Sequence, residues 1–218
     1  MSDSAPTFET SWDPLAPQAV AELLEAAPVR WWLSGGVALD RWLGAPIRPR
    51  PNTDVSVVLA DLPQLVASIP EGYDAWAVRG EDELVPFAEV DPGDEVQPVL
   101  IRDLATGSWV LRVNVEDGAP RAWVYKRDPR LQLPWERAVL DIDGIPTGAP
   151  EVQLVWKALR PRPEDDVDKD AVLPHLSEEA IAWYERCILS IHPHSSWSIH
   201  VRSPFAPAKA SWNRTQRR

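Results

Sequence analysis

The chain has 218 residues, a hydrophobic fraction of 44% and twelve tryptophans, which excludes an intrinsically disordered protein and suits one sizeable folded core. Its formal net charge of −11 argues against nucleic acid as a partner, because that binding needs lysine and arginine to neutralise phosphates. A cationic small molecule suits this charge better. The single cysteine, Cys187, excludes an internal disulfide. With no segment apolar enough to span a bilayer, we expect a cytoplasmic protein that does not enter membranes.

The first third of the chain predicts helices and strands in alternation. Pro17 suits the first turn of a helix, and Val20, Leu23 and Leu24 follow helical spacing as far as Pro28. The elements expected here are a helix over 17–27, a strand over 29–33, a helix over 37–43 that Gly44 closes, a buried strand over 55–59, and a short helix over 62–68. The glycine pair Gly35-Gly36 therefore falls between a strand and a helix.

The middle of the chain predicts a sheet of short strands broken by Gly, Pro and Asp. The expected strands cover 75–78, 84–90, 96–102, 109–116 and 121–126. In 109–116 the side chains alternate, so that Trp109, Leu111, Val113 and Val115 share one face and Val110, Arg112, Asn114 and Glu116 share the other. The polar face is expected to line a site.

The last part of the chain predicts a turn-rich segment over 141–150 followed by helices. These helices are expected over 151–159, from the acidic start 164–166 to about residue 173, and after Ser177 as the N-cap. Residues 201–218 hold five basic residues and no acid, which predicts a mobile tail. The expected organisation is an α/β domain over 1–150, a helical part over 151–200 and a basic tail over 201–218.

Ser34-Gly35-Gly36 and Asp54 form the most informative pattern, a strand, turn, helix and strand in succession. Exposed N–H groups at a helix start favour an anion, and an acid that opens the next strand can hold the cation of a triphosphate. The alternative is that the glycine pair forms only a tight turn and that Asp54 is an ordinary residue at a strand start. The spacing from the glycine pair to Arg48 and Asp54 favours a phosphate site over this alternative.

The resemblance to a known family rests on several segments of the chain. They are Trp32, Ser34-Gly35-Gly36, Ala38, Asp40, Leu43-Gly44, Arg48 and Asp54, then 126–130, 143–146, 149–154 with Lys157, 160–168 and 171–174. With these residues the chain resembles the nucleotidyltransferase superfamily, and within it the aminoglycoside 2''-adenylyltransferase-like group.

The resemblance implies a nucleotidyltransferase-like α/β domain, with a mixed sheet, flanking helices and a small helical C-terminal part. The implied reaction transfers a nucleoside monophosphate, with AMP expected, from a Mg²⁺-bound triphosphate such as ATP to a hydroxyl of a small acceptor such as an aminoglycoside. In the family the glycine turn cradles the triphosphate, and three acids on two strands hold two magnesium ions. The nucleotide-binding residues implied here are Ser34, Gly35, Gly36, Arg48 and Lys157.

The chain departs from the family at two of the three acids. Asp54 matches the second acid, but Asn52 stands where the first belongs, and Arg112 or Asn114 stands where the third belongs. We therefore expect Asp54, beside Asn52, to hold one metal ion, Arg112 to offset phosphate charge, and Glu116 to be a candidate base. The alternative is a catalytically impaired protein that binds a nucleotide or a partner on the same fold.

Three further sets of residues, and Lys157, have competing interpretations. Most tryptophans are expected in the core, with an aromatic cleft as the alternative. The four histidines are expected at the surface, because His192-Pro193-His194 lacks the spacing of a metal site. The acidic run 164–168 is expected to be a solvated helix start, with attraction of a polycationic acceptor as the alternative. Lys157 either reaches a nucleotide or lies in solvent beside Trp156.

Overall fold

The computed structural model describes residues 5–80, 83–91 and 93–203 and is built around a 10-stranded mixed sheet. The strands are β1 (Trp31–Ser34), β2 (Asp54–Val58), β3 (Tyr73–Arg79), β4 (Glu83–Pro86), β5 (Val96–Asp103), β6 (Trp109–Ala119), β7 (Ala122–Val124), β8 (Gln132–Pro134), β9 (Val139–Ile142) and β10 (Ile145–Gly148). The α-helices are α1 (Pro17–Leu23), α2 (Gly35–Leu43), α3 (Leu62–Ala67), α4 (Trp135–Ala138), α5 (Pro150–Lys157), α6 (Pro163–Val172), α7 (Glu178–Ile191) and α8 (Ser196–Arg202).

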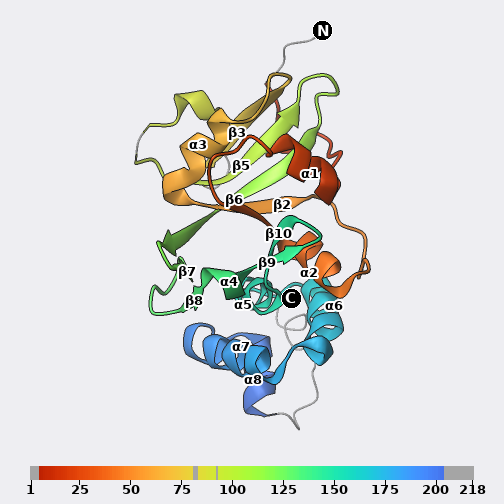
Figure 1. Ribbon diagram of the computed structural model, residues 1–218, viewed down its shortest axis with the longest axis vertical. Coiled ribbons are helices and arrows are strands. Elements are labelled where there is room, and N and C mark those ends of the chain that lie inside the picture. The colour runs from red at the N-terminus through yellow and green to blue at the C-terminus, as the bar shows by residue number, and fades with distance from the viewer. Residues whose placement is uncertain (1–4, 81–82, 92, 204–218) are drawn as a thin grey trace, which may run out of the picture.

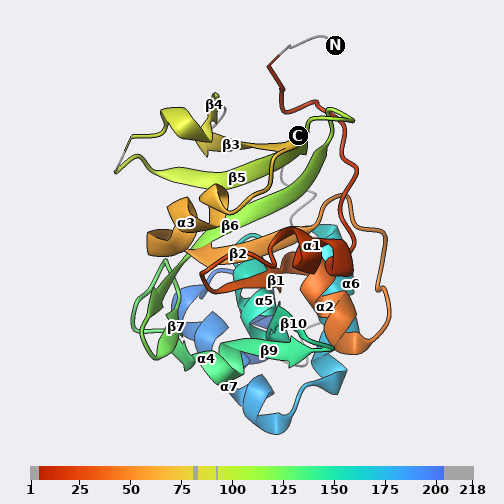
Figure 2. The same cartoon turned by 45° about the horizontal axis from the view of Figure 1, so that its top comes forward.

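Strands β1, β2 and β6 form the centre of the sheet, whose order is β4-β3-β5-β6-β2-β1-β10-β9. Strand β2 is antiparallel to β1 and parallel to β6, and β1 is parallel to β10. Figure 2 shows β3, β5, β6, β2 and β1 following one another across the sheet. Asp54 pairs with Ser34 on one side and with Arg112 on the other. The glycine turn, Asp54 and the polar face of β6 therefore meet at one place.

The two faces of the sheet carry separate hydrophobic cores. One core joins α1 and α3 to Leu33, Val55 and Val113. The other joins α5, α7 and α8 to Trp32 and Trp123, and Figure 1 shows α7 and α8 at the lower end of the molecule. Because strand residues alternate between faces, Arg112, Asn114 and Glu116 lie on the face that carries α5, α7 and α8. On this side Trp156 of α5 donates a hydrogen bond to Glu116 of β6.

The predicted fold class, a mixed sheet with flanking helices and a helical C-terminal part, is confirmed. The predicted helices and strands up to residue 126 are present with shifted ends, and the N-cap role of Ser177 is confirmed by its bond from the Ala180 N–H. The turn-rich prediction for 141–150 is wrong, because β9 and β10 form a hairpin there and β10 extends the central sheet. The strand β8 and the helix α4 were not predicted at all.

The described residues include only the start of the predicted tail over 201–218. Helix α8 continues to Arg202, so the predicted tail begins within a helix, and residues 204–218 lie outside the described residues. The boundary at residue 150 stays a prediction. No helix in the described part of the chain is long and apolar enough to cross a membrane.

The tryptophans are mainly core residues, as predicted. Trp32, Trp109 and Trp123 are at most 1% exposed, and Trp31, Trp135, Trp183 and Trp197 are also buried. Trp32 and Trp135 meet edge to face, which is a favourable geometry for large aromatic rings.

His192 corrects the prediction that all four histidines lie at the surface. His175, His194 and His200 are exposed, but His192 is 5% exposed and its Nε2 lies 3.0 Å from the Tyr125 hydroxyl. It follows helix α7, whose apolar face is buried, and so the fold carries it into the core. Burial, aided by Arg127, lowers the pKa of His192 below the ordinary value.

We expect His192 to make the protein less stable in mild acid. Because its folded pKa is lowered, the unfolded chain takes up the proton first, so stability falls as the pH drops through the ordinary value of about 6.5. Urea unfolding of the wild type and of His192→Asn, on both sides of that pH, measures the effect. The variant should lose less stability than the wild type, whereas His194→Asn should behave like the wild type. Equal losses in all three proteins would contradict the expectation.

Candidate functional site

A cleft of about 310 Å³ lies between the sheet and helices α5 and α6. The sheet supplies Ser34, Ser56, Gln97, Asn114 and Glu116, the start of α2 supplies Gly35, and the helical side supplies Gln153, Trp156, Lys157, Leu159, Arg160, Arg162 and Asp165. The lining includes three cationic side chains and two carboxylates, with further polar groups between them. A polar ligand with negative charge therefore suits the cleft better than an apolar one.

The glycine turn forms one wall of the cleft. Gly35 is the first residue of α2 and has a φ of 64°, a conformation that favours glycine. Its N–H donates to Gln153 Oε1 at 2.8 Å, and a Cβ on Gly35 would lie 2.6 Å from Asp54 Oδ2. Ser34 is the N-cap but makes no capping hydrogen bond. The turn is therefore held by α5 and not by its own cap.

Two buried polar atoms of cleft residues lack a partner. Among the described residues, the buried side-chain atoms without a hydrogen bond include Ser34 Oγ and Gln153 Nε2, and both residues line the cleft. Their side chains belong to residues that are at most 3% exposed. Because an unsatisfied buried polar group costs about 1–3 kcal/mol, a polar ligand that bonds to these atoms would be favoured.

Asp54 lies beneath Gly35, and neither Asp54 nor its neighbour Arg112 is among the residues that line the cleft. Asp54 Oδ1 accepts a hydrogen bond from Asn52 Nδ2 at 2.7 Å and lies 3.9 Å from Arg112 Nε. Burial raises the pKa of Asp54 above its ordinary value, and the charges of Arg112 and Lys157 oppose the rise only in part. The carboxylate is thus already engaged by one amide and approached by one cation.

Glu116, the candidate base, is 3% exposed and lines the cleft. Its Oε2 accepts hydrogen bonds from the indole N–H groups of Trp123 and Trp156. Burial raises the pKa of Glu116, and hydrogen bonds from Ser56 and from the two indoles oppose the rise. The carboxyl group therefore has several protein donors and little access to solvent.

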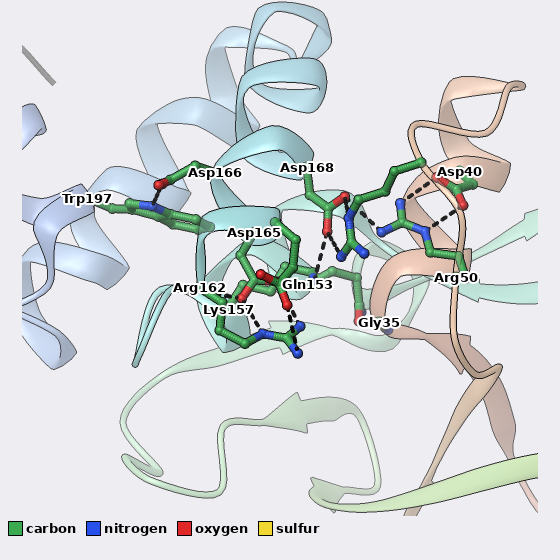
Figure 3. A network of polar contacts seen from close by, with 12 residues as sticks. Gly35, Asp40, Arg50, Gln153, Lys157, Arg162, Asp165, Asp166, Asp168 and Trp197 are labelled. Atoms are coloured by element: carbon green, nitrogen blue, oxygen red, sulfur yellow. Dashed lines mark hydrogen bonds and ion pairs between the residues drawn. The ribbon is translucent and has the colours of Figure 1, made fainter. Parts of the chain in front are cut away.

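A buried network of charges stands beside the cleft (Figure 3). Asp168 is fully buried and accepts hydrogen bonds from Arg48 at 2.8 and 2.9 Å and from Arg50 at 2.8 Å. Lys157 Nζ lies 3.1 Å from Asp168 and 2.7 Å from Asp165. The prediction of a solvated acidic run is therefore wrong for Asp165 and Asp168, because the start of α6 packs against these cations.

Arg48 and Gly36, both expected to bind nucleotide, do not line the cleft. Both guanidinium bonds of Arg48 go to Asp168. A Cβ on Gly36 would lie 2.5 Å from Arg50 Nη1, and Arg50 also bonds to Asp40 in bidentate fashion. Gly36 thus gives room for a structural arginine.

The cleft also contains residues that the sequence did not single out. Gln153 reaches the glycine turn from α5, one helical turn before Lys157, so the two side chains share a face of the helix. The four-residue spacing between Gln153 and Lys157 could have predicted that both face the same site. Arg160 belongs to a segment that resembles the family, but no role was predicted for it, because it follows the end of α5 and the loop path brings it to the cleft.

The residues at Asp54 do not fit a two-magnesium centre. Mg²⁺ needs hard oxygen ligands in a near-octahedral arrangement, and Asn52 offers its NH₂ group and not its oxygen to Asp54. Arg112, which pairs with Asp54 across the strands, is itself a cation. In the described part of the chain no group of three or more His, Cys, Asp or Glu residues is arranged to hold a metal ion.

No protein-family model matches the chain, and no curated protein matches it significantly. Among solved structures it is similar to the antibiotic-resistance factor ANT(2'')-Ia, with 18% identity over 80% of this chain and 83% of that chain and a TM-score of 0.42. For ANT(2'')-Ia in complex with adenylyl-2''-tobramycin the identity is 16%, the match covers 87% of this chain and 98% of that chain, and the TM-score is 0.44. For the lincomycin-bound lincosamide antibiotic adenylyltransferase LnuA the identity is 13%, the match covers 72% of this chain and 93% of that chain, and the TM-score is 0.47. At these identities the similarity is one of fold alone.

Proposed function

We propose that this chain is a nucleotidyltransferase-like protein that binds a nucleoside triphosphate in the cleft beside Gly35. The observation that carries the proposal is the pair of unpartnered buried atoms, Ser34 Oγ and Gln153 Nε2, on residues that line the cleft. Phosphate oxygens accept hydrogen bonds from hydroxyl and amide groups, and the start of α2 adds the favourable end of a helix dipole. A triphosphate therefore suits both the donors and the position.

The charges around the cleft support an anionic ligand. Within the described residues, Arg160 lines the cleft and has no hydrogen bond or ion pair of its own. The Arg112 side chain is 43% exposed and lies beyond hydrogen-bonding distance of Asp54. Lys157, in contrast, is 11% exposed and is neutralised by Asp165 and Asp168. We assign the phosphate contacts to Arg112 and Arg160, and the placing of α5 to Lys157.

Calorimetry with ATP and with GTP tests the proposal. We expect saturable binding of at least one nucleotide, and about 10- to 100-fold weaker binding by Arg160→Ala, because a hydrogen bond to a charged group contributes about 1.5–3 kcal/mol. Arg121→Ala is the matched control, since Arg121 lies at the β6–β7 turn and does not line the cleft. The absence of heat with both nucleotides at millimolar concentration would exclude the proposal.

Transfer of a nucleoside monophosphate, with AMP expected, to a hydroxyl of a small molecule such as an aminoglycoside is the second candidate function. Asp54 favours it, because this carboxylate keeps its position beside the glycine turn. Turnover of labelled ATP with Mg²⁺ and a panel of acceptors separates an enzyme from a binder. Turnover by the wild type that Asp54→Ala abolishes would establish the transferase. Turnover by neither the wild type nor Asn52→Asp would leave nucleotide binding as the function. The proposed location is the cytoplasm, whose reducing conditions suit the buried thiol of Cys187.

A further inference from the structure

The oxygens of Asp54 are already occupied on the side where a metal ion would have to approach. Oδ1 accepts the Asn52 amide at 2.7 Å, and Arg112 Nε lies 3.9 Å from the same atom. Oδ2 lies directly beneath the turn, 2.6 Å from the position that a Cβ of Gly35 would take. An incoming cation would have to displace the amide and approach the guanidinium.

The neighbouring side chains give no substitute ligand set. Arg112, Asn114 and Glu116 lie side by side with Asp54, Ser56 and Val58 in the parallel pairing of β6 with β2. Arg112 carries a positive charge, and Glu116 is held by two indole donors. The described residues contain no cluster of three carboxylate, imidazole or thiol side chains that suits a metal ion.

We propose that the cleft binds the triphosphate as a free anion, without a divalent cation, and that Arg112 and Arg160 neutralise its charge. The proposal rests on the proposed function and names the form of its ligand. It follows from the replacement of metal-binding acids by a fixed cation. Two cations near a single carboxylate repel one another, and the repulsion is strong in a partly buried site. Arginine can instead bond to phosphate oxygens through two parallel N–H donors.

The exposure of the two side chains agrees with this arrangement. The side chain of Arg112 is 43% exposed, whereas that of Asp54 is 19% exposed. The cation of the pair is therefore the more accessible partner for a ligand.

Calorimetric titration of the full chain with ATP, in excess EDTA and in excess Mg²⁺ at matched ionic strength, tests the proposal. Binding in EDTA that is as tight as in Mg²⁺, or tighter, is the expected result. Binding that appears only with Mg²⁺, or is at least tenfold weaker in EDTA, would overturn the proposal and leave the proposed function intact. No binding under either condition would remove both, and this outcome is distinguishable from the previous one.

A pair of variants tests the role assigned to Arg112. Arg112→Gln is expected to weaken ATP binding in EDTA about 10- to 100-fold, since it removes a charge-assisted contact. Arg121→Gln removes the same charge at the β6–β7 turn, away from Asp54 and from the cleft, and is expected to bind like the wild type. Thermal melting of both variants checks that they fold. An unchanged affinity of Arg112→Gln, or equal weakening in both variants, would overturn the assignment.

Discussion

Replacing Asp168 by asparagine is expected to lower the free energy of unfolding by about 3–5 kcal/mol, because it leaves buried cations without their counter-charge. Asp168 is fully buried, and Arg48, Arg50 and Lys157 all bond to it or pair with it. Burial alone would raise the pKa of Asp168, but these cations hold it below its ordinary value. The stabilisation is therefore present at neutral pH and is lost as the pH falls below the ordinary aspartate range.

Asp170→Asn is the matched control for Asp168→Asn. Asp170 lies on the same helix, its side chain is 72% exposed, and it pairs only with Lys169. An exposed pair contributes about 0–1 kcal/mol, so this variant should unfold close to the wild type in urea. A small change for Asp168→Asn, equal to that of Asp170→Asn, would show that the network does not stabilise the fold.

Replacing Gly35 by alanine is expected to weaken ATP binding about 10- to 100-fold, since it moves the turn away from its phosphate contacts. The added Cβ would lie 2.6 Å from Asp54 Oδ2, and the residue has a φ of 64°. Either Asp54 or the start of α2 has to shift. Such a shift also breaks the alignment of the Gly35 N–H with Gln153 Oε1.

Gly44→Ala separates backbone strain from the contact with Asp54. Gly44 has a φ of 74° but nothing lies within 4 Å of an added Cβ. Both alanine variants should lose about 1–2 kcal/mol of stability from the left-handed conformation, as measured by urea unfolding. Only Gly35→Ala should lose ATP affinity in calorimetry. Equal affinities in the two variants would show that the turn is not part of the binding site.

The hairpin of β9 and β10 has one feature that the local sequence could predict and one that it could not. Asp143 and Gly144 both have positive φ, as a tight two-residue hairpin turn requires, and an Asp-Gly pair is a known signal for it. That signal was present in the sequence. The parallel pairing of β10 with β1 was not predictable in the same way, because it joins residues far apart in the chain.

The sequence by itself determined the local features: the helix that follows Gly35, the alternation of β6, the cap at Ser177 and the absence of acids at Asn52 and Arg112. These features depend on backbone preference and on side-chain period, which act over a few residues. Only the tertiary structure decided which charges meet. Arg48 matched a phosphate-binding position in the sequence, yet it is bound to Asp168. Gln153, for which the sequence predicted no role, accepts the hydrogen bond that holds the glycine turn. Ion pairs and buried hydrogen bonds join distant segments, and burial determines their strength, so the sequence pattern alone could not assign them.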